Sequence, residues 1–237
     1  MKSIVTLLII GCASLAYAQP SQYFMPPVED DLVSTAREVY AVTTSGDTIR
    51  GQMNGSLMMG GQIRSFNIKS DDGSKYKFKA EDVKMLAIRA TNFMNRTSAM
   101  SAPSMPRLMD QDFKKIMNRE WVIFDQALLP KKDKFALMQL LNPGFDSKIK
   151  VYINPNAGES SQVAVSGLVI QDGGDDTSYL VVKDGNRAEV FKKKNYNQNA
   201  LNDLYTDCPD FEEAYSGERF WWSNFSEHVL FYDKLCN

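Results

Sequence analysis

Short β-prone runs joined by turn residues recur between residues 39 and 192, and this rhythm constrains the fold more than any other feature of the chain. The first pair of runs is Val39–Thr43 and Thr48–Met53, and the turn residues Ser45-Gly46-Asp47 separate them. Two β-prone runs with such a short polar connection predict a β-hairpin. We therefore expect neighbouring strands to pair in antiparallel sheets.

The same device repeats along the chain. Tyr76 and Phe78 alternate with lysines, as in a half-buried strand, and Asp184-Gly185 indicates a further hairpin. We predict a mainly β (α+β) fold in which residues 37–192 form about ten short antiparallel strands. The further strand-forming stretches are 63–68, 75–79, 83–90, 120–129, 134–141, 148–155, 162–170 and 178–194.

The last part of the chain changes to a helical period. Leu201 and Leu204 fall on one helical face. Asn224, with Glu227 three residues later, resembles a capping box that starts a final helix. We expect residues 193–237 to form a helical C-terminal tail that packs on the β-rich domain.

Residues 91–118 interrupt the strands with prolines, serines and several methionines. We interpret them as a Met-rich insertion or long loop, with one helical turn at 110–117. Met100, Met105 and Met109 are candidate contacts to a partner, because methionine adapts to irregular apolar surfaces. Thioethers also select Cu(I), so a copper site is the alternative, although the stretch has no histidine or cysteine.

The first eighteen residues have the pattern of a signal peptide. Lys2 precedes the apolar run 4–10, and Ala16-Tyr17-Ala18 is the small-x-small motif of a cleavage site. We expect cleavage after Ala18 and a periplasmic or secreted protein. The run is too short for a transmembrane span, which needs about 20 apolar residues, and no later segment could form one.

Two alternatives concern the residues that follow. Ile9-Ile10-Gly11-Cys12 resembles a lipoprotein box, in which Cys12 would carry a lipid anchor. Residues 19–36 contain prolines and an acidic run without a sustained period, and we expect a flexible leader there.

The two cysteines beyond Cys12 are Cys208 and Cys236. In an oxidising compartment we expect them to form a disulfide, worth on the order of 3 kcal/mol in the chain-entropy model. Two unpaired thiols are the alternative.

Several classes of chemistry lack their residues. His228 is the only histidine, which excludes zinc and iron sites that need two histidines from one chain, and no G-x-S-x-G motif is present. The formal net charge of −2 gives no footprint of a nucleic-acid partner. We therefore expect no cofactor and no catalytic residue can be assigned.

Aromatic and acidic groups leave further options open. Trp221 and Trp222 belong to the densest aromatic cluster and could stack on a glycan, but their spacing also fits core packing of the last helix. Asp175, Asp176 and Glu189 are candidate acids if the fold brings them into one cleft, because glycosidases use two carboxyl groups.

Three stretches carry a resemblance to known proteins: YAVTTSGDTIRGQM, YLVVKDGNRAEVFKKKNYNQNALNDLYTDCPDF and SEHVLFYDKLC. With them the chain resembles a group of exported proteins of unknown function in Bacteroidota. Those proteins begin with a GDTI-type hairpin and have a Lys-rich strand leading into an Asp-Cys-Pro helix. The resemblance implies an envelope or secreted protein and carries no catalytic residue.

Two functional hypotheses follow. The first is a non-enzymatic binding or structural module of the cell envelope, with a protein or glycan partner. The second is a small exported hydrolase or glycan-binding protein whose site is assembled from scattered acidic and aromatic residues.

Overall fold

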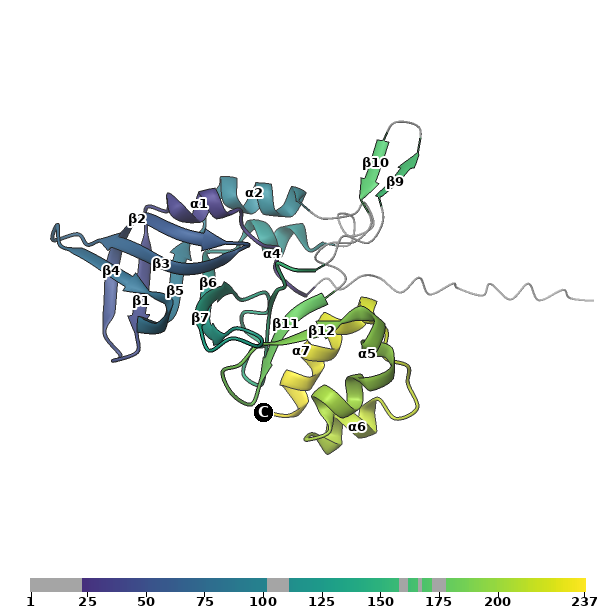
Figure 1. Cartoon of the computed structure of the whole chain (residues 1–237). Helices are drawn as coiled ribbons and strands as arrows, with labels where there is room; N and C mark the ends of the chain where they lie inside the picture. The colour runs from purple at the N-terminus through teal and green to yellow at the C-terminus, as the bar shows by residue number, and fades with distance from the viewer. Residues whose placement is uncertain (1–22, 102–110, 158–161, 166–167, 172–177) are drawn as a thin grey trace, which may run out of the picture.

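The computed structural model describes residues 23–101, 111–157, 162–165, 168–171 and 178–237. Helices and strands alternate in the order shown in Figure 1. The first half contains α1 (Asp30–Ser34), β1 (Val39–Thr43), β2 (Thr48–Met59), β3 (Gln62–Lys69), β4 (Lys75–Lys79), η1 (Ala80–Asp82), β5 (Val83–Arg89), α2 (Asn92–Met100), α4 (Phe113–Met117), β6 (Trp121–Leu128) and β7 (Phe135–Gln139). The second half contains β8 (Ile149–Ile153), β9 (Gln162–Val165), β10 (Leu168–Gln171), β11 (Ser178–Lys183), β12 (Glu189–Lys192), α5 (Lys193–Ala200), η3 (Leu201–Tyr205), α6 (Pro209–Ala214), η4 (Trp222–Asn224) and α7 (Phe225–Leu235).

Six antiparallel strands close into a barrel. The sheet order is β2-β1-β5-β6-β7-β3-β4, and an additional pairing of β2 with β3 joins its ends, so that β4 extends outward from β3. β2 pairs with β1 through residues 48–51 and with β3 through residues 52–59. The register shifts between Met53 and Ser56, where Gly55 has φ 95°. Such an irregularity bends a strand, which lets one strand serve both neighbours.

Apolar side chains from the strands fill the barrel. The largest of them are Phe66 and Phe124, each at most 1% exposed. Val33 of α1 and Met94 of α2 belong to the same cluster of buried residues. Both helices therefore contribute to the barrel core and do not merely lie over it.

A second sheet has the order β12-β11-β8 and continues from the barrel. Leu140, after β7, forms an antiparallel bridge with Tyr152 of β8. Asn142 is fully buried, donates to the carbonyl oxygens of Phe145 and Ile149, and accepts from the backbone N–H of Val151. This one side chain thus satisfies three backbone groups at the junction, which fixes the sheet against the barrel.

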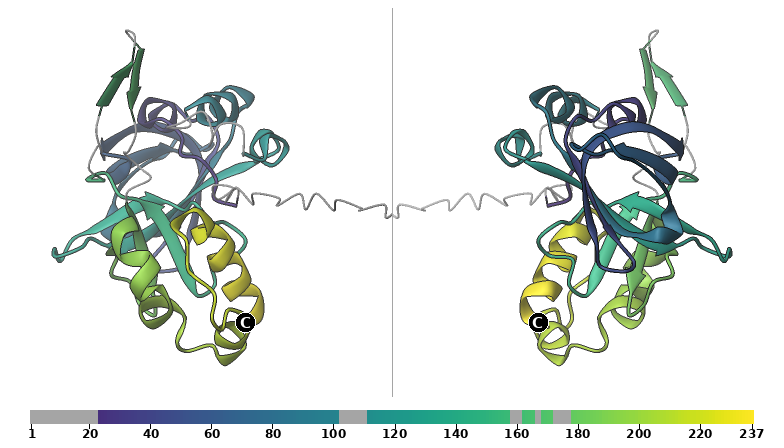
Figure 2. Two further views of the ribbon diagram at one scale, coloured as in Figure 1. Left: turned by 90° about the vertical axis from the view of Figure 1, so that its right-hand side faces the viewer. Right: turned by 90° about the vertical axis from the view of Figure 1, so that its left-hand side faces the viewer.

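The helical tail packs on the second sheet and away from α1 and α2 (Figure 2). Its core is aromatic: Tyr196, Tyr205, Phe225 and Tyr232 are each at most 1% exposed and belong to one cluster with Tyr179 of β11. A disulfide joins Cys208 to Cys236, which confirms the predicted pairing and excludes the alternative of two free thiols.

The predicted fold class is confirmed, because the sheets are antiparallel and helices follow the last strand. β1 and β4 have the predicted bounds, whereas the stretch 162–170 forms the two paired strands β9 and β10. Asn224 occupies the predicted N-cap of α7, but its side chain forms no capping hydrogen bond. None of the described helices is long and apolar enough to cross a bilayer.

The prediction of a flexible leader at 19–36 is wrong from Tyr23 onward. The N–H of Met25 donates to the carbonyl of Leu141, and that of Val28 donates to the Gln139 side chain. Val33 is fully buried. This segment lacks a sequence period because it runs along several elements in turn, and each contact is made by a different kind of side chain.

The prediction of a loop at 91–118 is wrong for α2, whereas α4 confirms the helical turn predicted at 110–117. Thr91 caps α2 by accepting from the N–H of Met94. Arg119 is buried and donates to Asn95, Ser98 and the carbonyl of Pro26. These bonds hold α2 and the leader together. Residues 102–110 lie outside the described ranges.

Candidate functional site

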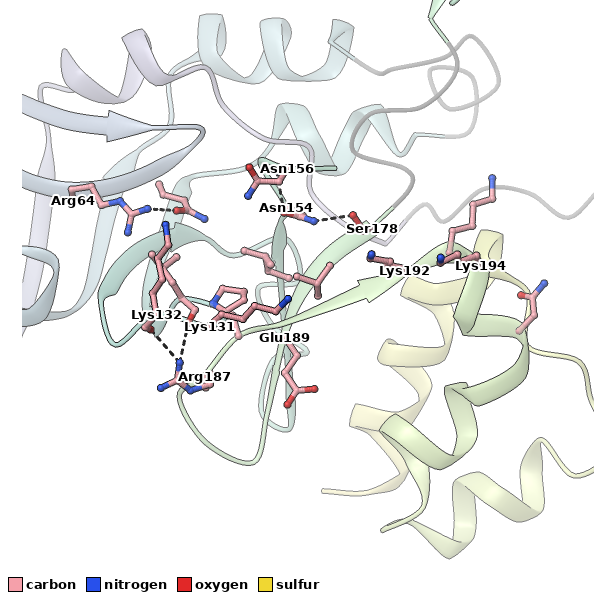
Figure 3. A pocket seen from close by; sticks show the side chains of 18 residues that line it. Arg64, Lys131, Lys132, Asn154, Asn156, Ser178, Arg187, Glu189, Lys192 and Lys194 are labelled. Carbon is pink, nitrogen blue, oxygen red and sulfur yellow. Dashed lines mark hydrogen bonds between the residues drawn. The ribbon is translucent and has the colours of Figure 1, made fainter. Parts of the chain in front are cut away.

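An open cleft of about 1430 Å³ lies where the barrel meets the second sheet and α5 (Figure 3). Its walls come from the start of β3, the turn between β6 and β7, the strands β11 and β12, and the first turns of α5. Residues far apart in the sequence therefore meet here only because the second sheet is fixed against the barrel.

The described lining is strongly cationic. Seven of its side chains carry a positive charge and Glu189 is its one carboxylate, whereas the whole chain has a net charge of −2. We call this feature the basic cleft. Its cations are Arg64, Lys131, Lys132, Arg187, Lys192, Lys193 and Lys194. A concave surface lined by one sign of charge focuses the electrostatic potential and attracts ligands of the opposite sign.

The barrel side of the cleft presents three cations, Arg64, Lys131 and Lys132, which we call the barrel-side cations. Arg64 donates to the side chain of Gln62 at 2.6 Å. Burial lowers the pKa of Arg64, but an arginine remains charged at neutral pH. Lys131 has a left-handed backbone with φ 58°. A non-glycine residue rarely adopts this conformation, so the turn needs support from elsewhere.

Arg187 gives that support. Its guanidinium donates to the carbonyl oxygens of Leu129 and Lys132, both at 3.1 Å, and to the carboxylate of Asp133 at 2.6 Å. Arg187 therefore ties the turn between β6 and β7 to the segment that leads into β12. Its charge is partly compensated by Asp133, so it positions the wall more than it offers a free cation.

The opposite side presents Lys192, Lys193 and Lys194, which we call the helix-side lysines (Figure 3). β12 ends at Lys192, which is also the N-cap of α5, and no side chain caps this helix. The helix N-terminus already carries a partial positive charge, which acidic residues normally offset. Three lysines at this position cost stability in the empty protein, and an anion bound there would relieve the repulsion.

Neutral polar groups lie between the two sides. Asn154 is buried and donates to the hydroxyl of Ser178 at 2.9 Å, and its Oδ1 accepts from the N–H of Asn156 at 3.1 Å. Asn197 lines the helix side, and its Oδ1 is buried without a hydrogen-bond donor among the described residues. No aromatic ring is present in the described lining.

The cations are free to bind a ligand. Among the described residues, neither the barrel-side cations nor the helix-side lysines form an ion pair with a carboxylate. Unpaired cations in a shared concave surface are the arrangement that recognises phosphate, sulfate or carboxylate groups.

His228 has a structural role and lies outside the cleft. It is 3% exposed, and its Nδ1 is 2.6 Å from the hydroxyl of Tyr196, which in turn is 3.2 Å from that of Tyr205. Burial lowers the pKa of His228 from 6.5 to about 4 and raises the pKa of both tyrosines. The imidazole is therefore neutral at pH 7 and has no access to a substrate.

The two tryptophans predicted as a glycan-stacking pair do not act together. Trp222 is 8% exposed and packs against Tyr179 and Phe225, with ring centroids 5.4 and 5.3 Å away. The glycan interpretation is wrong for Trp222, because its ring is enclosed by the core of the tail. Trp221 is 44% exposed, and the guanidinium of Arg219 lies 4.0 Å from its ring centroid.

The methionine hypothesis is only partly addressed by the described residues. Met100 is 77% exposed at the end of α2, as a partner contact requires. Met105 and Met109 lie outside the described ranges, and so do Cys12, Asp175 and Asp176. Glu189, the third candidate acid, is exposed and lines the basic cleft.

Sequence reasoning missed the basic cleft. The run Lys192–Lys194 is visible in the sequence, but a short charge run is usually a solvated surface. Arg64 and Lys132 gave no signal, because they lie in different strand and turn segments. Only the approach of these segments in space makes a site of them.

Comparison with protein-family models, with curated proteins and with solved structures yields no match to this chain.

Proposed function

We propose that the protein is a non-enzymatic binding module of the cell envelope, and that it holds an anionic ligand in the basic cleft. The observation that carries this proposal is the set of six cations without carboxylate partners, gathered around one open cleft in a chain of negative net charge. The size of the cleft, about 1430 Å³, suits a ligand larger than a single small anion.

Export is the second part of the proposal. The N-terminal signal pattern and the resemblance to exported proteins of Bacteroidota support it. The disulfide between Cys208 and Cys236 is compatible with an oxidising compartment outside the cytoplasm.

The hydrolase hypothesis receives less support. Glycoside hydrolysis uses two carboxyl groups on either side of the bond that breaks, and Glu189 is the one carboxylate in the described lining. A binding role needs no second acid, and the free cations supply what such a role requires.

Calorimetric titration with tripolyphosphate at low salt tests the binding role. We expect wild-type protein to bind, and the cleft variant Lys132→Gln/Lys194→Gln to lose at least about tenfold in affinity, because charge-assisted hydrogen bonds are lost. The matched control is Lys75→Gln/Lys77→Gln, which removes the same charge from the exposed face of β4. Equal losses in both variants, or no binding by the wild type, would overturn the proposal.

A further inference from the structure

Cations stand on two separate sides of the basic cleft, and this separation says something about the ligand. The barrel-side cations come from β3 and the turn after β6, whereas the helix-side lysines come from the end of β12 and the start of α5. In Figure 3 the labelled members of the two groups lie on opposite sides of Asn154 and Ser178. A single phosphate or carboxylate engages one group. A ligand that engages both groups must carry at least two separated negative charges.

The neutral floor indicates what connects those charges. Gln62, Asn154 and Ser178 are all buried to within 6% of full burial. Their side chains are held by hydrogen bonds to one another or to neighbouring groups. Amides and hydroxyls that both donate and accept match the hydroxyl groups that surround a sugar ring on every side. A peptide, in contrast, offers backbone donors and acceptors only along its two edges.

Asn197 adds an acceptor to this donor-rich surface. Its buried Oδ1 has no donor among the described residues, and a buried unsatisfied acceptor costs about 1–3 kcal/mol. Carboxylate, sulfate and phosphate groups in their ionised forms bring no donor. A ligand that also carries hydroxyl groups does.

The lining argues against a nucleic acid. Proteins that bind single strands stack bases on aromatic side chains, and the described lining has no aromatic ring. The apolar part of the cleft consists of aliphatic side chains such as Leu129, Pro130 and Leu180, which offer contact area without a stacking platform.

We propose that the ligand of the basic cleft is an acidic polysaccharide, in which several sugar units carry a carboxylate or sulfate group, bound across the floor from the barrel-side cations to the helix-side lysines. This inference rests on the proposed function and specifies its ligand. Binding at two connected points multiplies affinity through the effective concentration of the second charge. Affinity should therefore rise steeply with the length of the oligosaccharide.

A length series of galacturonate oligomers tests the inference, with a sulfated hexasaccharide as a second arm that separates carboxylate from sulfate. We expect the acidic hexamer to bind at least about 100-fold more tightly than the monomer, and a neutral hexasaccharide not to bind. Lys132→Gln/Lys194→Gln should remove most of the length dependence, whereas Lys75→Gln/Lys77→Gln should leave it unchanged. Equal affinity of monomer and hexamer for the wild type would contradict the two-sided arrangement.

A hexaglutamate peptide and the variant Asn197→Ala test the carbohydrate part. We expect the peptide to bind at least about tenfold more weakly than the acidic hexasaccharide. Asn197→Ala should weaken hexasaccharide binding but leave tripolyphosphate binding unchanged, and alanine is well tolerated within a helix. A peptide that binds as tightly as the sugar would overturn this inference. Tripolyphosphate binding without any oligosaccharide binding would also overturn it and leave the proposed function standing, whereas no anion binding at all would overturn both.

Discussion

His228 shows how burial turns an ionisable residue into a condition for folding. The unfolded chain binds a proton at this side chain as the pH falls through about 6.5, whereas the folded protein does so only near pH 4. Stability is therefore complete above pH 6.5 and declines as the pH falls from 6.5 to 4, by on the order of 3 kcal/mol for this residue. Urea unfolding at a series of pH values measures this decline.

The variant His228→Gln is the control, because carboxylates titrate in the same range. We expect the difference in unfolding free energy between wild type and variant to shrink as the pH falls from 6.5 to 4. Parallel pH profiles for the two proteins would show that His228 does not carry the effect.

At the scale of elements, the turn between β2 and β3 depends on one glycine. Gly60 has φ 59°, and a Cβ atom there would lie 2.6 Å from Cβ of Pro155. Gly61 has φ 72° with no atom within 4 Å of its Cβ position. Both alanine variants pay about 1 kcal/mol for the left-handed backbone. We expect Gly60→Ala to cost at least about 1 kcal/mol more than Gly61→Ala in chemical denaturation, because only Gly60 touches the segment after β8. Equal costs would show that this contact is dispensable.

The disulfide is the second device at this scale, since it ties the end of α7 to the start of α6. It closes a loop with a sequence separation of 28, so its removal should cost on the order of 3 kcal/mol. Thermal unfolding of Cys208→Ser/Cys236→Ser, compared with wild type with and without reductant, measures this cost. Reductant should lower the midpoint of the wild type only. If the wild type and the double variant melt at the same temperature, the bridge does not stabilise the tail.

At the scale of the whole molecule, export predicts a defined covalent form. The protein recovered from the native host should begin at Gln19, and its mass should show the loss of two hydrogens at Cys208 and Cys236. Intact-mass spectrometry before and after reduction checks both points. A diacylglycerol group on Cys12, detected by palmitate labelling that Cys12→Ala abolishes, would favour the lipoprotein alternative. A chain that retains Met1 would contradict export by this signal.

Local patterns in the sequence determined much of the fold. Alternation and turn residues predicted β1, β4 and the hairpin of β11 and β12, because strand and turn preferences act over a few neighbouring residues. The spacing of Cys208 and Cys236 in an exported chain was enough to predict their pairing. The helical tail was likewise visible in its period.

Tertiary packing alone decided the rest. Closure of the barrel depends on β2 pairing with two partners, and the burial of Val33 and Met94 depends on a core assembled from distant strands. The basic cleft exists because Asn142 and the Arg187 contacts fix the second sheet beside the barrel, which brings Arg64 within reach of the same ligand as Lys194. Such long-range approaches are set by the packing free energy of the whole molecule, which a local pattern does not encode.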